Sequence, residues 1–131
     1  MNTKPTLQEI FDNHQIDSND GEWDANNLDL QFSDEDAIIH WVARYGTSDE
    51  LRVLIELGAS VNLRGDIGRT PLIEAVSWDK VENVRTLLEY GADITAIDDY
   101  GDSALDIAEL NKNPQIINLL NTAKSDKKSN P

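Results

Sequence analysis

The sequence predicts an all-α solenoid of about three helix–turn–helix repeats. Two observations carry this prediction. The chain matches itself when it is shifted by 33 residues, which indicates a repeated structural unit. Each unit also contains apolar residues at helical spacing, between a helix-start signal and a glycine. We place an N-terminal capping segment at residues 1–33, the repeats at 34–120 and a disordered tail at 121–131.

The self-match sets the boundaries of the units. Three pairs of segments agree at this offset: 52–56 with 85–89, 57–61 with 90–94, and 67–72 with 100–105. Several independent matches at one offset are unlike a chance similarity. We therefore divide the repeat region into units at 34–66, 67–99 and 100–120.

The first helix of each unit begins at a capping residue. Thr70 offers a hydroxyl as N-cap and Pro71 fits the first helical position. Two further pairs have capping-box spacing: Ser103 with Asp106, and Ser33 with Asp36. The apolar residues that we expect these helices to bury are Leu72, Ala75 and Val76, with Ile39, Val42, Ala43, Leu105 and Ala108 at matching places.

The second helix of each unit follows the same logic. Its apolar positions are Leu51, Leu54, Ile55, Val84, Leu87, Leu88, Ile117 and Leu120. Gly58 and Gly91 follow these helices, where a left-handed residue is needed. Short extended pieces and a glycine turn come next and predict a projecting hairpin. Pro114 lies near the start of the last second helix, so we expect that helix to be incomplete.

A helix, a turn, a second helix and a hairpin in 33 residues resemble the ankyrin-repeat family. The motif Gly-x-Thr-Pro-Leu occurs at 68–72, Gly-Ala-Asp occurs at 91–93, and the motif histidine falls at His40. The resemblance covers residues 34–120 and implies that His40 joins neighbouring units by hydrogen bonds. Ala37 and Ile38 replace Thr-Pro in the first unit, and Ile73 and Asp106 replace the histidine later, as in terminal capping repeats.

The two ends fit the repeat poorly. Residues 7–11 can form a short amphipathic helix, and residues 25–32 resemble a worn hairpin. We interpret both as a cap over the apolar edge of the first unit. Residues 121–131 contain one apolar residue, Ala123, and are expected to be disordered.

The composition limits location and partners. The chain has 25 acidic and 11 basic residues, a net charge of -14, and no cysteine. A disulfide is therefore excluded, and neither a signal peptide nor a membrane span is visible, so we expect a monomer in the cytoplasm. Such a charge repels nucleic acid and anionic membranes and attracts basic proteins. It can also serve solubility alone.

A search for chemistry predicts no catalytic residue, no metal site and no cofactor. His14 and His40 are too few for a zinc site without carboxylates. The acidic stretch 17–22 fails as a calcium loop, because Ile16 would fall at the first ligand position. The aspartates in 98–102 are expected at a water-exposed hairpin tip, where nothing would raise a carboxyl pKa.

The resemblance places the partner-binding face on the hairpin tips, or fingers, and on the first helices, or palm. Tyr45, Trp78 and Asn111 share one repeat position, and Arg44, Ser77 and Leu110 share the position before it. Trp, Tyr and Arg dominate binding energy at interfaces. Trp78 could instead pack on the neighbouring unit as core. The candidate partner-binding residues are Trp78, Tyr100, Tyr45, Asp66, Ile67, Arg69, Ser77, Asp99, Asp102, Asn111 and Arg44.

The predicted function is non-catalytic protein binding. Small, acidic, cysteine-free proteins with few such repeats resemble bacterial immunity proteins or antitoxins, which would bind and inhibit a basic toxin or nuclease domain. The alternative is a general adaptor or assembly protein that binds a cytoplasmic partner without inhibiting it. An enzyme is the third class, and the absence of a catalytic constellation argues against it.

Overall fold

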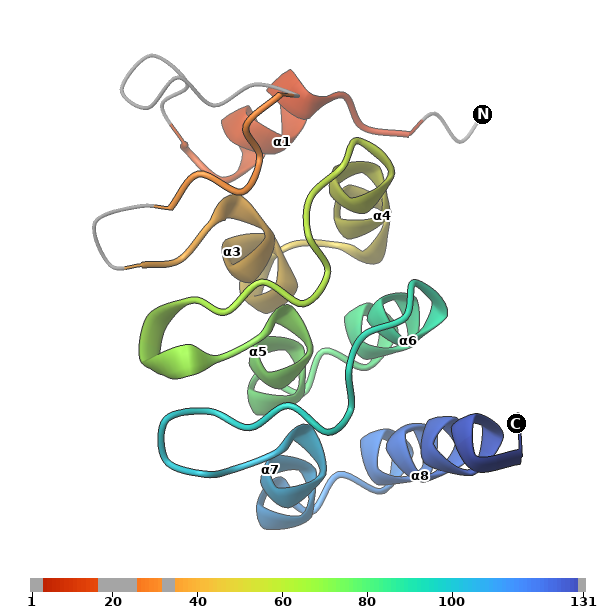
Figure 1. Cartoon of the computed structure of the whole chain (residues 1–131). Helices are drawn as coiled ribbons and strands as arrows, with labels where there is room; N and C mark the ends of the chain where they lie inside the picture. Colours follow the sequence, from red (N-terminus) through yellow and green to blue (C-terminus); the bar gives the residue numbers. More distant parts are fainter. Residues whose placement is uncertain (1–3, 17–25, 32–34, 130–131) are drawn as a thin grey trace.

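Two parallel columns of helices form the molecule. The computed structural model describes residues 4–16, 26–31 and 35–129. The first helices are α3 (Ile38–Tyr45), α5 (Pro71–Ser77) and α7 (Ala104–Asn111), and the second helices are α4 (Ser48–Glu56), α6 (Val81–Glu89) and α8 (Pro114–Ser129). Figure 1 shows each set stacked in its own column, with loops projecting beside the first helices. This is the all-α solenoid that the sequence predicts.

The helix starts are largely those expected from the sequence. Thr70 accepts a hydrogen bond from the backbone N–H of Ile73 at 3.3 Å, and Ser103 forms a full capping box with Asp106. The predicted start at Ser33 and Asp36 is wrong, because α3 begins after Ala37. Ser33 itself lies outside the described residues. Alanine cannot cap a helix, and the Nδ1 atom of His40 accepts the Ala37 N–H at 2.9 Å instead.

The core runs between the two columns. Each first helix contributes apolar residues to it and each second helix packs its apolar face against them. Every fully buried side chain of this size contributes about 1.5–3 kcal/mol through loss of water contact. The largest fully buried apolar side chains are Ile10, Ile38, Ile39, Leu51, Leu54, Leu72, Ile73, Leu87, Ile116, Val42 and Val76.

The loops turn where the sequence places glycine. Gly58 and Gly91 have φ angles of 112° and 85°, in the left-handed region that other residues avoid. The predicted hairpins form as tight loops, and within the described residues the pairing is limited to one isolated bridge between Ile97 and Ser103. Neighbouring loops are tied together, because the backbone N–H of Asp99 donates to the Ile67 carbonyl at 2.9 Å.

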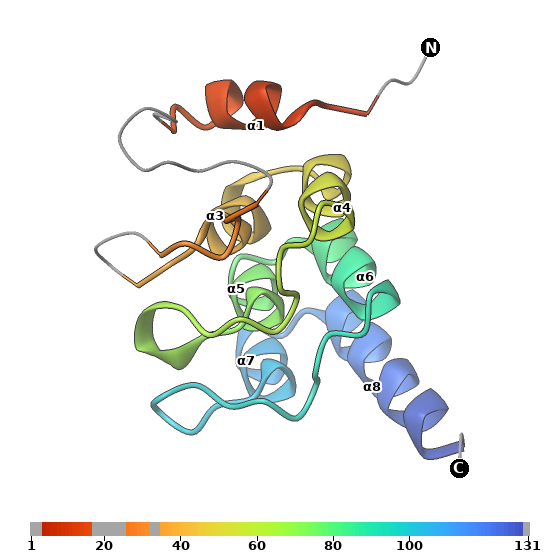
Figure 2. The ribbon, with the colours of Figure 1, turned by 45° about the horizontal axis from the view of Figure 1, so that its top comes forward.

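The N-terminal segment packs on the first unit. Helix α1 (Leu7–Asn13) contains the buried residues Ile10 and Phe11 and contacts α4. Figure 2 shows α1 at the end of the stack, next to α3 and α4. The Nε2 atom of His14 lies 3.0 Å from the buried carboxylate of Glu50, which joins this segment to α4.

The C-terminal end differs from the sequence prediction. The last second helix is complete, and α8 continues for 16 residues to Ser129, although residues 121–131 were expected to be disordered. Pro114 occupies the first helical position, where its missing N–H costs nothing. Residues 115–129 contain neither proline nor glycine, and Ala and Lys favour helix, so nothing stops the helix after its last buried residue, Leu120.

Candidate functional site

Three aromatic side chains gather where the first helices end. Trp41 and Tyr45 come from α3, and Trp78 follows the last residue of α5. The Trp41 and Tyr45 ring centroids are 4.7 Å apart, and those of Tyr45 and Trp78 are 5.1 Å apart at an interplanar angle of 68°. Tyr45 remains 43% exposed and Trp78 50% exposed. We call these three residues the aromatic palm.

A row of alternating charges lies beside the aromatic palm and crosses the first two units. Its members, in order, are Asp36, Arg44, Glu74, Arg69 and Asp98, and we call them the charge ladder. Arg44 forms an ion pair with Asp36, and its Nε lies 2.7 Å from a Glu74 oxygen. Arg69 lies 3.8 Å from the other Glu74 oxygen and 3.4 Å from the Asp98 carboxylate. The Arg44–Glu74 pair joins the first two units, and the Arg69–Asp98 pair joins the two ends of the second unit.

Because the members of the charge ladder are largely buried, their charged forms depend on the ion pairs between them. Burial works against the charged form of Arg44, but the carboxylates of Glu74 and Asp36 outweigh it and raise the pKa of this guanidinium. Burial raises the pKa of Glu74, and the nearby Arg44 and Arg69 offset this only in part. The two arginines therefore serve mainly to neutralise buried carboxylates.

The charge ladder changes how two candidate residues are interpreted. Arg44 and Arg69 were predicted as partner contacts, yet their side chains are only 17% and 24% exposed and both are paired with acids. The guanidinium carbon of Arg44 also lies 5.6 Å from the centre of the Tyr45 ring, which it supports from the side. We assign both arginines to holding the binding face in shape.

The fingers carry exposed acidic residues, and one of them, Asp99, lies 3.9 Å from the guanidinium of Arg64. Asp66, Asp99 and Asp102 are exposed, Ile67 is half-buried, and Tyr100 is 74% exposed at the tip of the third unit's loop. Asp98 corrects the expectation that this whole tip faces water, because its carboxylate is buried and accepts the backbone N–H groups of Tyr100 and Asp102 at 2.9 and 3.0 Å. Asp98 therefore shapes the loop from inside.

Two further candidates lie at the lower end of the palm. The Asn111 amide donates to the carbonyls of Val76 and Ser77 at 3.4 and 3.3 Å and thus closes the end of α5. Ser77 is half-buried beneath it. Leu110, one residue earlier, is an exposed apolar residue of α7, with 79% of its surface accessible.

The motif histidine forms its hydrogen bonds within the first unit, 34–66, and not between neighbouring units as the resemblance implies. His40 is fully buried, and because its Nδ1 accepts the Ala37 N–H, the ring proton sits on Nε2 and is donated to the Leu63 carbonyl at 2.7 Å. Burial lowers the pKa of His40, which keeps the ring neutral. Across residues 4–16, 26–31 and 35–129, no group of three or more potential metal ligands gathers. None of the described helices is long and apolar enough to cross a membrane.

Comparison with known families agrees with this architecture. The family model described as ankyrin repeats in three copies matches residues 4–98. The chain belongs to the ankyrin-repeat family. The match begins at residue 4, so α1 lies inside the matched region, while α7 and α8 continue the ankyrin stack beyond it. Ankyrin repeats mediate binding between proteins.

Relatives with ankyrin repeats come from several kinds of organism. Protein phosphatase 1 regulatory subunit 12A of Rattus norvegicus is 34% identical over 97 residues, 70% of this chain and 9% of that protein. BCL-6 corepressor-like protein 1 of Homo sapiens is 37% identical over 70 residues, 53% of this chain and 4% of that protein. An ankyrin repeat-containing protein of Schizosaccharomyces pombe is 36% identical over 74 residues, 56% of this chain and 34% of that protein. The chain thus matches a minor part of each relative.

Sequence reasoning missed the acidic members of the charge ladder. Residues 69 and 102, the equivalents of Asp36 one and two units later, are Arg and Asp. The sign of the charge therefore changes along the repeat, and the repeat does not indicate an ion pair at this position. Asp36, Glu74 and Asp98 are all buried. In so acidic a sequence, nothing distinguishes them from the exposed acidic residues. For Glu74 one signal was available in the sequence, because it lies between the apolar residues Ile73 and Ala75 of α5.

Proposed function

We propose that this chain is an immunity protein of the bacterial type, which binds a basic toxin with its palm and fingers and blocks it. The carrying observation is the charge balance of this face. Arg44 and Arg69 are neutralised within the charge ladder, while Asp66, Asp99 and Asp102 are exposed on the fingers, where Asp99 lies 3.9 Å from Arg64. An apolar centre with an acidic rim suits a basic protein surface.

The mechanism that we propose is occlusion. Many toxins of this class are basic nucleases whose sites are built to hold phosphate groups, and the carboxylates on the fingers would compete for the same cationic side chains. Trp78 and Tyr45 would supply the apolar contact area and Tyr100 would reach the partner from the finger. Two or three ankyrin units can bury about 800 Å² on each partner, which is enough for a specific complex. The inhibitor would act in the cytoplasm as a monomer.

An adaptor that binds without inhibiting is the second candidate. One relative is named as a regulatory subunit of protein phosphatase 1, so a segment similar to this chain occurs in a protein that serves another. Both candidates use the same face. They differ in consequence, because an immunity protein abolishes a measurable toxicity and an adaptor does not.

The test combines capture with neutralisation. The tagged chain is used to retain partners from a lysate of the source organism at low and then high salt, and the partners are identified by mass spectrometry. We expect one basic protein at one-to-one stoichiometry that is toxic when expressed alone and harmless when co-expressed with this chain. A retained protein that is not toxic would refute the immunity proposal and favour the adaptor.

Variants tie the neutralisation to this face. Trp78→Ala should weaken binding by about 2 kcal/mol, roughly 30-fold, while leaving the thermal transition intact. Asp66→Asn with Asp99→Asn should weaken binding more at low salt than at high salt. The matched control is Asp49→Asn with Glu82→Gln, which removes the same charge from exposed positions on α4 and α6. Equal losses in both charge variants would show that net charge, not this face, drives binding.

A further inference from the structure

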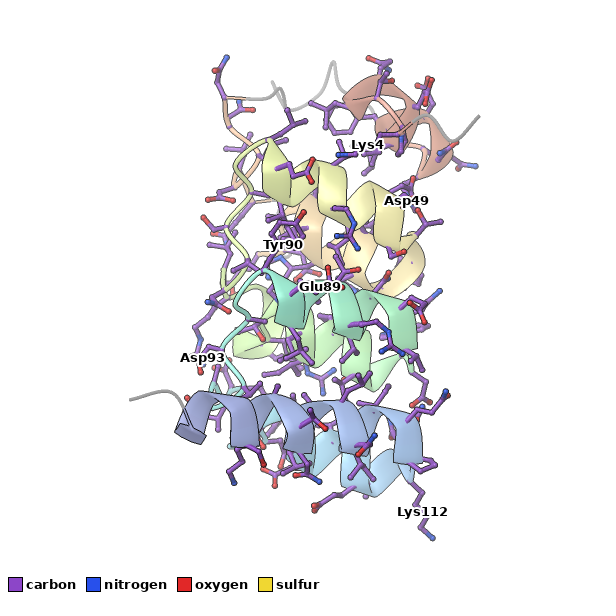
Figure 3. All side chains as sticks on the ribbon, turned by 90° about the vertical axis from the view of Figure 1, so that its right-hand side faces the viewer. Lys4, Asp49, Glu89, Tyr90, Asp93 and Lys112 are labelled. Carbon is purple, nitrogen blue, oxygen red and sulfur yellow. The ribbon has the colours of Figure 1, made fainter. Side chains whose placement is uncertain are left out.

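An open groove lies between α6 and α8, on the side of the stack formed by the second helices. Its volume is about 710 Å³, and it is lined by Leu88, Ile94 and Leu119, with Arg85, Glu89 and Ala123 among the other lining residues. Figure 3 looks onto this side, where α4, α6 and α8 lie one below another. The groove is built from residues outside the palm and fingers.

The equivalent place one unit earlier is filled by a tyrosine. The Tyr90 hydroxyl donates to Oε1 of Glu56 at 2.8 Å, and the guanidinium carbon of Arg52 lies 5.8 Å from the centre of its ring. Arg52 in turn pairs with Oε2 of Glu89 at 3.0 Å. Figure 3 shows Tyr90 and Glu89 between α4 and α6. The ring, the cation and the carboxylate together close the gap between these two helices.

The 33-residue repeat identifies what the groove lacks. At this offset Arg52 corresponds to Arg85, Glu56 to Glu89, and Tyr90 to Ala123. The cation and the carboxylate are thus retained, and alanine replaces the aromatic ring. Oε2 of Glu89 forms an ion pair with Arg52 at 3.0 Å, just as Oε2 of Glu56 forms one with Lys4 at 3.0 Å. Its Oε1 is therefore the atom that corresponds to the hydroxyl acceptor in the filled unit.

We propose that this groove binds the side chain of a tyrosine presented by a second protein. The incoming hydroxyl donates to Oε1 of Glu89, the ring face meets the guanidinium of Arg85, and the ring edge packs on Leu88 and Leu119. The complementarity is electrostatic as well as steric, because the proton donor meets a carboxylate and the electron-rich ring face meets a cation. Arg85 is suited to this role, since its side chain is 48% exposed and its Nε lies 3.5 Å from Glu82 within the same helix. The proposal is independent of what binds the palm.

The test uses p-cresol, which is the tyrosine side chain as a free molecule, and the full-length chain labelled with ¹⁵N. We expect saturable amide shifts confined to residues 85–94 and 118–123, with a Kd on the order of millimolar for so small a ligand. Toluene, which lacks the hydroxyl, should bind several-fold more weakly. Ala123→Tyr should fill the groove from within and abolish the p-cresol shifts, while Arg85→Ala should weaken binding about two- to fivefold.

Three results would overturn the proposal. If toluene bound as tightly as p-cresol, the proposed hydrogen bond from the ligand hydroxyl to Glu89 would be refuted. Shifts that persist unchanged in Ala123→Tyr would place the ligand elsewhere. Unchanged p-cresol binding in Arg85→Ala would refute the contact between the ring and the Arg85 guanidinium. Because Arg85 is exposed, this variant remains informative even if Ala123→Tyr disturbs α8.

Discussion

Replacing Arg44 with methionine isolates the charge ladder from the rest of the fold. Methionine keeps an unbranched stem, so the aliphatic packing beside Tyr45 is largely retained. The substitution removes the cation that pairs with Asp36 and lies 2.7 Å from Glu74. Both carboxylates are buried, and each then loses its nearest positive charge.

The expected cost follows from what each carboxylate keeps. Removing one partner of a buried ion pair costs about 3–5 kcal/mol. Asp36 still accepts the backbone N–H of Asp66 at 2.9 Å, and Glu74 still has Arg69 at 3.8 Å. We therefore expect the lower end, about 3 kcal/mol of unfolding free energy, or about 10 °C in Tm for a chain of this size.

The assay is urea unfolding followed by circular dichroism at pH 7 and again near pH 5. Burial already raises the pKa of Glu74 above its ordinary value of 4.5, and loss of Arg44 raises it further. A group with a raised carboxyl pKa binds its proton more readily in the folded state, so the penalty should shrink as the pH falls. Arg85→Met, at an exposed position on α6, is the matched control and should cost less than about 0.5 kcal/mol. An Arg44→Met variant as stable as this control would refute the structural role of the charge ladder.

Three further predictions concern contacts within and between the packed segments. Asn83→Ala removes the buried amide that donates to the Ala43 and Gly46 carbonyls at 3.1 Å, and should cost about 2–3 kcal/mol in urea unfolding. Gly65→Ala should destabilise the chain in a thermal melt, because a Cβ atom there would clash with the Asp36 carboxylate. Burial raises the pKa of Glu50, but hydrogen bonds from the Thr47 backbone, His14 and Asn13 outweigh it and hold this pKa below 4.5. Its stabilisation is present above that pH and is lost as the pH falls through the folded pKa, so Glu50→Gln should flatten the acid side of a stability–pH profile.

The fold was predictable because the helix starts and ends of most units are set by residues close together in the sequence. Thr70 and Ser103 cap helices where the sequence places caps, and Gly58 and Gly91 adopt left-handed angles where helices end. The failures were local too. Residues 121–129 have no apolar face, and the sequence therefore predicted disorder, whereas α8 simply continues from its packed first turns.

The candidate site was predictable only in part. The repeat spacing of Tyr45 and Trp78 predicted neighbours, and their rings are in contact with much of their surface exposed. The same spacing could not show that Arg44 and Arg69 are neutralised, because their acidic partners occupy non-equivalent positions of the repeat. Nor could it show that Asp98 is buried inside the finger that it belongs to.

The sequence by itself determined the repeat length, most of the helix boundaries within units and the family. These depend on contacts between residues close in the chain and on apolar spacing that recurs with the period. Only the tertiary structure decided which charges of the candidate face are paired and where the stack is left unfilled between α6 and α8. The reason is physical: ion pairs and grooves depend on the distances between side chains in the folded chain, and a periodic sequence places its units in order without showing which side chains will meet.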